Sequence, residues 1–72
     1  MTIATVLEAE RMRLGLSQSE LARRSQMSAG RIRGILVGEV PNPGIFTLAK
    51  VLVALGRNLA WLEKILLTQG DT

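Results

Sequence analysis

The chain has 72 residues, of which 47% are hydrophobic, and its nine Lys and Arg against six Asp and Glu give a net charge of +3. This length allows a single domain near the lower size limit for a self-sufficient hydrophobic core, and the basic balance fits a polyanionic partner without identifying one. The absence of Cys and His excludes disulfides and cysteine metal sites, and it removes the commonest general base and metal ligand.

The first predicted element is an amphipathic helix over residues 3–14. Its apolar stripe is formed by Ile3, Leu7, Met12 and Leu14. Gly15 is expected to end this helix in the left-handed conformation. Ser17 and Glu20 then fit a capping box, in which Ser17 accepts a hydrogen bond from the first turn of the next helix and Glu20 reaches back.

Residues 18–37 are predicted to form two short helices joined by a tight turn. The first ends near Ser25, and the second is capped by Ser28 and continues to Val37. Apolar residues occur where the helices would touch, namely at Leu21, Ala22, Met27, Ile32 and Ile35. The small Ala22 allows a close crossing, and the branched Ile32 fills the angle between the helices. This pattern is typical of a helix-turn-helix, whose second helix is presented to the DNA major groove.

The remainder of the chain is predicted to form a loop and two further helices. A loop over residues 40–44 places Asn42 or Gly44 near the next N-cap, and a fourth helix follows over residues 45–55. Asn58 is expected to cap a fifth helix over residues 58–68. Five helices with short connections predict an all-α fold, with residues 1–72 as one domain. Few aromatic residues are present, which also favours packed helices.

No segment has the features of a membrane span or a secretory signal. The longest nearly apolar run, residues 45–55, is too short to cross a bilayer. The N-terminus lacks a basic region and a cleavage pattern. The sequence therefore predicts a cytoplasmic protein.

The segment GLSQSELARRSQMS resembles the core of the lambdoid phage repressor and Cro proteins, often called the Xre-type helix-turn-helix family. The likeness extends to RMRLGLSQ before this segment and to NPGIFTLAKVLVALG and LAWL after it, without a gap. It covers nearly the whole chain. The resemblance implies a five-helix, lambda-repressor-like DNA-binding domain, usually dimeric, that binds a palindromic operator and regulates transcription.

Three positions depart from the family pattern. Gln26 stands in the left-handed turn where the family usually has Gly, at a cost of about 1 kcal/mol. Leu36 stands where the third helix often has Glu paired with an Arg at the position of Arg11, so Arg11 is expected to be free for Glu39 or a DNA phosphate. The following loop has no cation, so phosphate binding there would fall to backbone N–H groups and Asn42.

Several polar residues are predicted to contact the DNA backbone. Gln18 opens the second helix, where free N–H groups attract a phosphate, and the matching Gln of the family binds the backbone. Ser28 can cap its helix and donate to a phosphate, and Arg31 lies to one side of the groove-facing stripe, where a phosphate contact is expected. Arg23 and Arg24 are weaker candidates.

The groove-facing stripe of the family corresponds to Ala29, Gly30, Arg33 and Gly34. Small residues here can indicate a helix contact. They can also let the helix backbone sit deep in the groove, with Ala29 against a thymine methyl group. Arg33 is the candidate for bidentate recognition of a guanine edge.

Specific binding by this domain is expected to require a homodimer, since one or two Arg per half-site supply only a few kcal/mol of base discrimination. The last helix has more apolar residues than one face can bury. Some of Leu59, Leu62 and Leu66 are expected to close the core, with Trp61, Ile65 or Leu67 as the exposed surplus. The predicted dimer interface comprises Leu59, Trp61, Leu62, Ile65 and Leu66, in a twofold contact.

Other functions fit the sequence less well. Catalysis is not expected, because the chain lacks His and Cys and no spaced pair of carboxylates stands out. No metal and no cofactor are expected. The main alternative is an antitoxin-type or protein-interaction module that binds a cognate toxin and regulates its own operon. A third interpretation is a domain that has lost base specificity and retains only protein binding.

Overall fold

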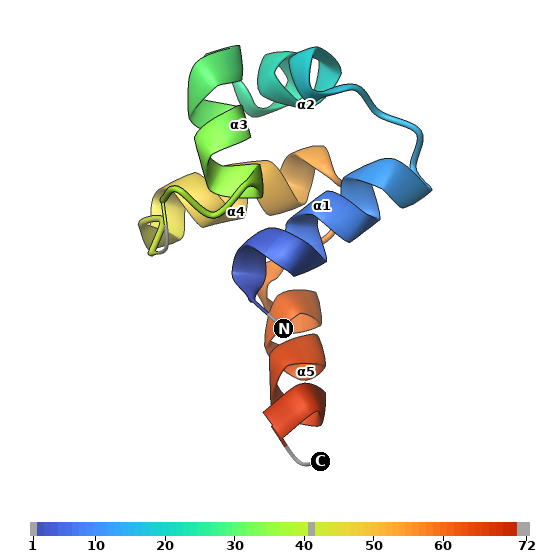
Figure 1. The fold of residues 1–72 in the computed structure, drawn as a ribbon. Helices are drawn as coiled ribbons and strands as arrows, with labels where there is room; N and C mark the ends of the chain where they lie inside the picture. Colours follow the sequence, from blue (N-terminus) through green and yellow to red (C-terminus); the bar gives the residue numbers. More distant parts are fainter. Residues whose placement is uncertain (1, 41, 71–72) are drawn as a thin grey trace.

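The computed structural model describes residues 2–40 and 42–70, with side chains up to Thr68. Five α-helices form this part of the chain, and it contains no β-strand: α1 (Ile3–Arg13), α2 (Gln18–Ser25), α3 (Ala29–Leu36), α4 (Ile45–Ala54) and α5 (Leu59–Gly70) (Figure 1). The all-α, five-helix fold predicted from the sequence is confirmed, and α1, α3 and α4 each end one residue before the predicted position.

Three helices begin at the side-chain caps that the sequence predicts. Ser17 Oγ accepts a hydrogen bond from Glu20 N at 3.0 Å, and Ser28 Oγ accepts one from Arg31 N at 3.1 Å. Asn58 Oδ1 accepts one from Trp61 N at 2.9 Å. These caps satisfy N–H groups that the first turn of a helix leaves unpaired. The capping box of α2 forms only in part, because the Glu20 carboxylate accepts from the Arg23 guanidinium at 2.6 Å.

Two left-handed residues end α1 and α2, as predicted. Gly15 has a φ of +71°, and Gln26 has a φ of +59°. At Gln26 the backbone turns back on α2: Gln26 N donates to Arg23 O at 3.2 Å, and Met27 N donates to Ala22 O at 3.0 Å. These bonds pair carbonyl groups that the end of α2 would otherwise leave free.

The hydrophobic core draws side chains from every helix. The most fully buried are Leu7, Leu21, Ile32, Ile35, Val51 and Leu52. The predicted stripe on α1 is partly wrong, because Met12 is 66% exposed and Leu14 is 40% exposed. The buried face of α1 instead follows Val6, Leu7 and Glu10.

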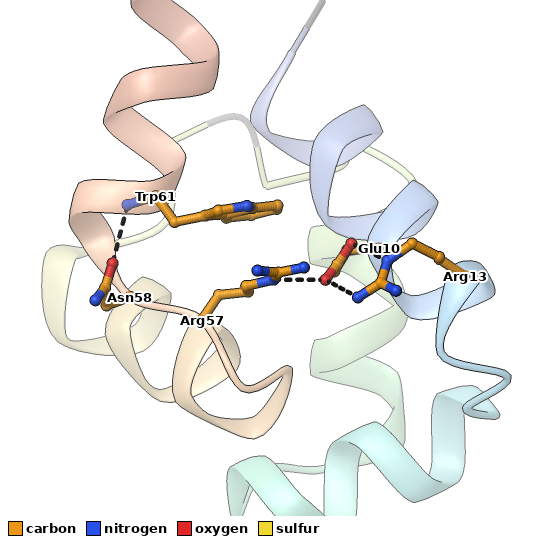
Figure 2. Close-up of polar contacts among 5 residues, drawn as sticks. All are labelled: Glu10, Arg13, Arg57, Asn58 and Trp61. Atoms are coloured by element: carbon orange, nitrogen blue, oxygen red, sulfur yellow. Dashed lines mark hydrogen bonds and ion pairs between the residues drawn. The ribbon is translucent and has the colours of Figure 1, made fainter.

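Glu10 can be buried on α1 because two arginines neutralise its carboxylate (Figure 2). The carboxylate accepts from Arg13 Nε at 2.9 Å, from Arg13 Nη2 at 2.8 Å and from Arg57 Nε at 2.7 Å. The hydrogen bonds from Arg13, against the opposing effect of burial and with further help from Arg57, lower the pKa of Glu10 to about 2. Arg57 also lies 5.0 Å from the centre of the Trp61 ring, a cation–π distance. This cluster joins α1 to the start of α5.

The last helix projects away from the rest of the domain (Figure 1). Its first turns pack on the core through Leu62, which is 3% exposed, whereas Leu67 near its end is 62% exposed. Among the described residues no single helix is long and apolar enough to cross a bilayer. The segments Ile45–Ala54 and Leu59–Thr68 meet that criterion only as a pair, bent by 99°.

Candidate nucleic-acid interface

The helix-turn-helix is fixed by contacts along one side of α2 and α3. Leu21 and Ala22 on α2 and Ile32 and Ile35 on α3 are all at most 4% exposed. Ser25 is also buried, and its hydroxyl donates to Leu21 O at 2.7 Å, so it leaves no unpaired polar group in the contact. The predicted packing of residues 18–37 is therefore confirmed, and it determines which side of α3 remains exposed.

The exposed side of α3 and its C-cap residue is a stripe of four residues: Ala29, Gly30, Arg33 and Val37. Their spacing of three or four residues places them on one face of a helix. Val37, which is 50% exposed, is a member of this stripe that the sequence analysis missed. Its spacing could have indicated this, because Val37 follows Arg33 by four residues, the same interval that separates Ala29 from Arg33.

Gly34 does not belong to this stripe, so the prediction that it faces the groove is wrong. The residue is buried, because the chain after α3 folds back over it. Its carbonyl oxygen accepts from Glu39 N at 2.9 Å and from Val40 N at 3.2 Å. A Cβ atom added at Gly34 would lie 3.6 Å from Val40 Cγ2. Gly30 has no such neighbour within 4 Å and stays in the exposed stripe.

Arg31 lies beside the exposed stripe and points to the start of α4. Its Nη2 donates to Thr47 Oγ1 at 3.1 Å, and the residue remains exposed. The N-cap residue of α4 is Gly44, which provides no side-chain hydrogen bond. A guanidinium and the positive end of a helix therefore lie on the same side of the domain. The role of Thr47 was missed, because 16 residues separate it from Arg31 and no local pattern links them.

The other predicted backbone contacts lie at helix starts and in the loop. Gln18 is the first residue of α2 and is half-buried, and Asn42 is exposed in the loop before the α4 cap. Ser28 accepts its capping bond, which leaves the hydroxyl hydrogen for another acceptor. Arg11 is not free for Glu39 or a phosphate as expected, because its guanidinium donates to the Glu8 carboxylate and to Leu16 O.

The predicted dimer residues differ in their exposure. Leu62 is 3% exposed and belongs to the core, so its assignment to an interface is wrong. Trp61 is half-buried under Arg57, and Ile65 and Leu66 are half-buried against the core. Only Leu59, at 37%, is an exposed member of the predicted set.

A comparison with protein families matches residues 7–62 to the helix-turn-helix family, a range that includes all of α2, α3 and α4. No curated protein and no solved structure matches the chain. The matched range is more than half of the chain, and the order of its helices and the packing of α2 on α3 agree with this family. The chain belongs to the Xre/Cro/C1-type helix-turn-helix family of DNA-binding transcriptional regulators.

Proposed function

We propose that the protein is a sequence-specific repressor that binds a palindromic operator as a homodimer. The main support is the exposed stripe of α3, in which one long cationic side chain, Arg33, stands among the small or short residues Ala29, Gly30 and Val37. Small side chains let a helix backbone approach the floor of the major groove closely. This stripe is therefore suited to groove insertion.

Arg33 is the proposed base-reading residue. It is exposed and forms no ion pair with any residue that the structure describes, so its guanidinium is available for a guanine edge. Arginine can contact O6 and N7 of guanine at once, and such a contact supplies about 1–3 kcal/mol of discrimination. Ala29 and Val37 flank it on the same face and offer methyl groups to thymine.

The proposed phosphate contacts surround this stripe. Gln18 at the start of α2, Ser28 at the start of α3, and Arg31 beside the first turn of α4 lie at the positive ends of three helices. Phosphate contacts of this kind orient a domain on the duplex without selecting its sequence. Asn42 in the preceding loop is the fourth proposed backbone contact.

A homodimer follows from the size of these contributions. One base-reading Arg per domain cannot supply the roughly 4–10 kcal/mol that separates specific from non-specific DNA binding. Two copies on an inverted repeat double the base contacts and the phosphate contacts. Such occupancy excludes RNA polymerase from an overlapping promoter, which is the proposed mode of repression.

Selection from a random duplex library tests the proposal. We expect enrichment of an inverted repeat, bound by two copies, with an affinity that falls steeply with salt because several phosphates are neutralised. In transcription with purified polymerase, a promoter overlapping the selected site should give less transcript as protein is added. Failure to enrich any sequence would contradict specific binding, and increased transcript would contradict repression.

Two arginine variants test the division of roles. Arg33→Ala should reduce discrimination at one operator position, whereas Arg31→Ala should weaken cognate and random DNA to a similar extent and reduce the salt slope by about one. Binding to operators altered one base pair at a time measures both effects. Identical behaviour of the two variants on all sequences would contradict the assignment of Arg33.

A further inference from the structure

A small apolar cavity lies between the start of α1 and the chain that follows α3. Ile3 and Ala4 of α1 line one side of it, and Ile35, Val40 and Pro43 line the other. Its volume is about 130 Å³, and it is partly open to solvent, so a small molecule can enter it without unfolding of the domain. We call it the α1–α3 cavity.

The cavity results from the turn that ends α3. Gly38 has a φ of +86°, a conformation that favours glycine, and the chain then folds back so that Glu39 N and Val40 N donate to Gly34 O at 2.9 and 3.2 Å. A Cβ atom added at Gly38 would lie 3.9 Å from Ala4 Cβ. Two of the smallest residues therefore face each other across the cavity, and they leave space that larger side chains would fill.

The polar groups around the cavity already have partners within the chain. Thr2 supplies the only polar side chain among the described lining residues, and its hydroxyl oxygen accepts from Thr5 N at 3.2 Å and lies 2.8 Å from the Thr5 hydroxyl. Gly38 N donates to Ile35 O at 3.3 Å. A charged or strongly polar ligand would lose its hydration here without replacement, whereas an apolar ligand would gain from burial.

We propose that the α1–α3 cavity is a binding site for a small uncharged apolar molecule of about the size of one aromatic ring. A protein cavity of about 150 Å³ lined by apolar side chains binds benzene, because water finds too few polar partners there. The α1–α3 cavity is similar in volume and lining. The site is independent of the homodimer and of the DNA contacts in the proposed function.

A bound ring would stabilise the folded domain. The lining residues on α1 and those after α3 are more than 30 positions apart in the sequence, so the unfolded chain has no such cavity. A ligand that binds only the folded state raises stability by mass action. It would do so by connecting α1 to the end of α3 and to Pro43, which directly precedes the N-cap of α4 at Gly44.

Fluorobenzene is the probe for this site, with binding followed by fluorine NMR and by thermal unfolding. We expect a saturable change in the fluorine signal. At about ten times the half-saturation concentration, the Tm should rise by roughly 6–11 °C. Benzoate has the same ring with a charge, and at equal concentration it should change neither signal. Absence of saturable fluorobenzene binding, or equal binding of benzoate, would overturn the proposal.

Two alanine variants on α1 locate the site. Ala4→Leu would place an isobutyl group in the cavity and should abolish fluorobenzene binding and the rise in Tm. Ala9→Leu is the matched control, because Ala9 is exposed on the same helix and does not line the cavity. Loss of binding in Ala4→Leu, with binding retained in Ala9→Leu, supports the proposal. Unaltered binding by a folded Ala4→Leu variant would place the probe elsewhere and overturn it.

A third variant tests the site if Ala4→Leu does not fold, which circular dichroism shows. Val40→Ala removes two methyl groups from the lining and enlarges the cavity. It should shift the binding preference from fluorobenzene towards the bulkier 1-fluoronaphthalene. A preference unchanged from wild type would overturn the proposal.

Discussion

Two glycines of α3 offer a matched test of which side of this helix meets DNA. Gly30 lies in the exposed stripe with Arg33, whereas Gly34 lies under the chain segment that follows the helix. Neither has a positive φ, so alanine fits the backbone at both positions. The substitutions Gly30→Ala and Gly34→Ala add the same methyl group on different sides of one helix.

The expected effect on stability can be worked out from the surroundings. Replacing Gly by Ala in a helix interior stabilises by about 1 kcal/mol. At Gly34 the new methyl group would meet Val40 Cγ2 at 3.6 Å and Glu39 Oε2 at 3.9 Å, which are ordinary van der Waals distances. A gain of about 1 kcal/mol in the free energy of unfolding should raise the Tm by roughly 4–8 °C for a domain of this size. Gly30, at the second position of α3, should give a smaller gain.

For DNA binding the larger effect is expected at Gly30, whereas for stability it is expected at Gly34. Gly34→Ala should leave the affinity for the selected operator unchanged, because its methyl group is covered by Val40. Gly30→Ala should hold the helix backbone away from the groove floor and lower the affinity by about tenfold, or about 1.4 kcal/mol. Thermal unfolding followed by circular dichroism measures the first quantity, and fluorescence anisotropy with labelled operator measures the second.

If Gly34→Ala lowers the affinity as much as Gly30→Ala, the exposed stripe of α3 is not the DNA-facing side. If Gly34→Ala destabilises the domain, Val40 does not cover α3 in the way that the structure shows.

Substitutions at three further positions test local features of the fold. Gln26→Gly should stabilise the domain by about 0.5–1 kcal/mol in chemical unfolding, since Gln26 has a φ of +59°; no gain would mean that this side chain is not strained. Glu10 has a pKa of about 2 against an ordinary value of 4.5, so its stabilisation is complete above pH 4.5 and is lost as the pH falls towards 2. Glu10→Gln should remove that pH dependence. Because water around Arg13 and Arg57 screens these ion pairs, the substitution should lower the free energy of unfolding by about 1–2 kcal/mol at pH 7. A pH profile of stability unchanged from wild type would contradict the assignment. Ser28→Ala should lose the cap of α3 and cost about 1 kcal/mol, whereas Ser28→Asp should keep the cap and repel phosphate, so equal DNA affinity for Ser28→Asp and wild type would exclude a phosphate contact there.

The features predicted well from the sequence are those that neighbouring residues determine. The caps at Ser17, Ser28 and Asn58 each bind a backbone N–H three residues ahead, so the residue type and the following pattern suffice. The left-handed turn at Gln26 was implied by the resemblance, because the family usually has Gly at this position. The small Ala22 opposite Ile32 likewise identified the helix crossing.

The features that were missed depend on distant parts of the chain. The buried face of α1 passes through Glu10, because Arg57, 47 residues away, supplies a partner for the carboxylate. Burial of a charged residue is costly unless it is paired, so a local pattern assigns such a residue to the surface. Gly34 was placed in the groove because it matches a groove-facing position of the family, and nothing local shows that Val40 returns over it.

The exposed residues of α4 were not predicted, because the hydrophobic pattern of this helix does not indicate which side is buried. The segment from Ile45 to Leu55 is apolar on nearly all sides, and such a helix is usually buried on all sides. In this small domain the neighbouring helices cover only the side with Leu48, Val51 and Leu52. The remaining side stays open, with Phe46 at its centre.

The position of α4 connects the proposed DNA contacts to the core of the domain. One side of α4 packs against α2, its first turn accepts a hydrogen bond from Arg31 through Thr47, and its outer side displays Phe46 and Val53. A short helix of ten residues is stiff, so the relative placement of these sides does not vary. In the proposed homodimer, each α3 helix would then keep a fixed position relative to the core of its own copy. A palindromic operator with fixed half-site spacing is the DNA target that such a geometry can select.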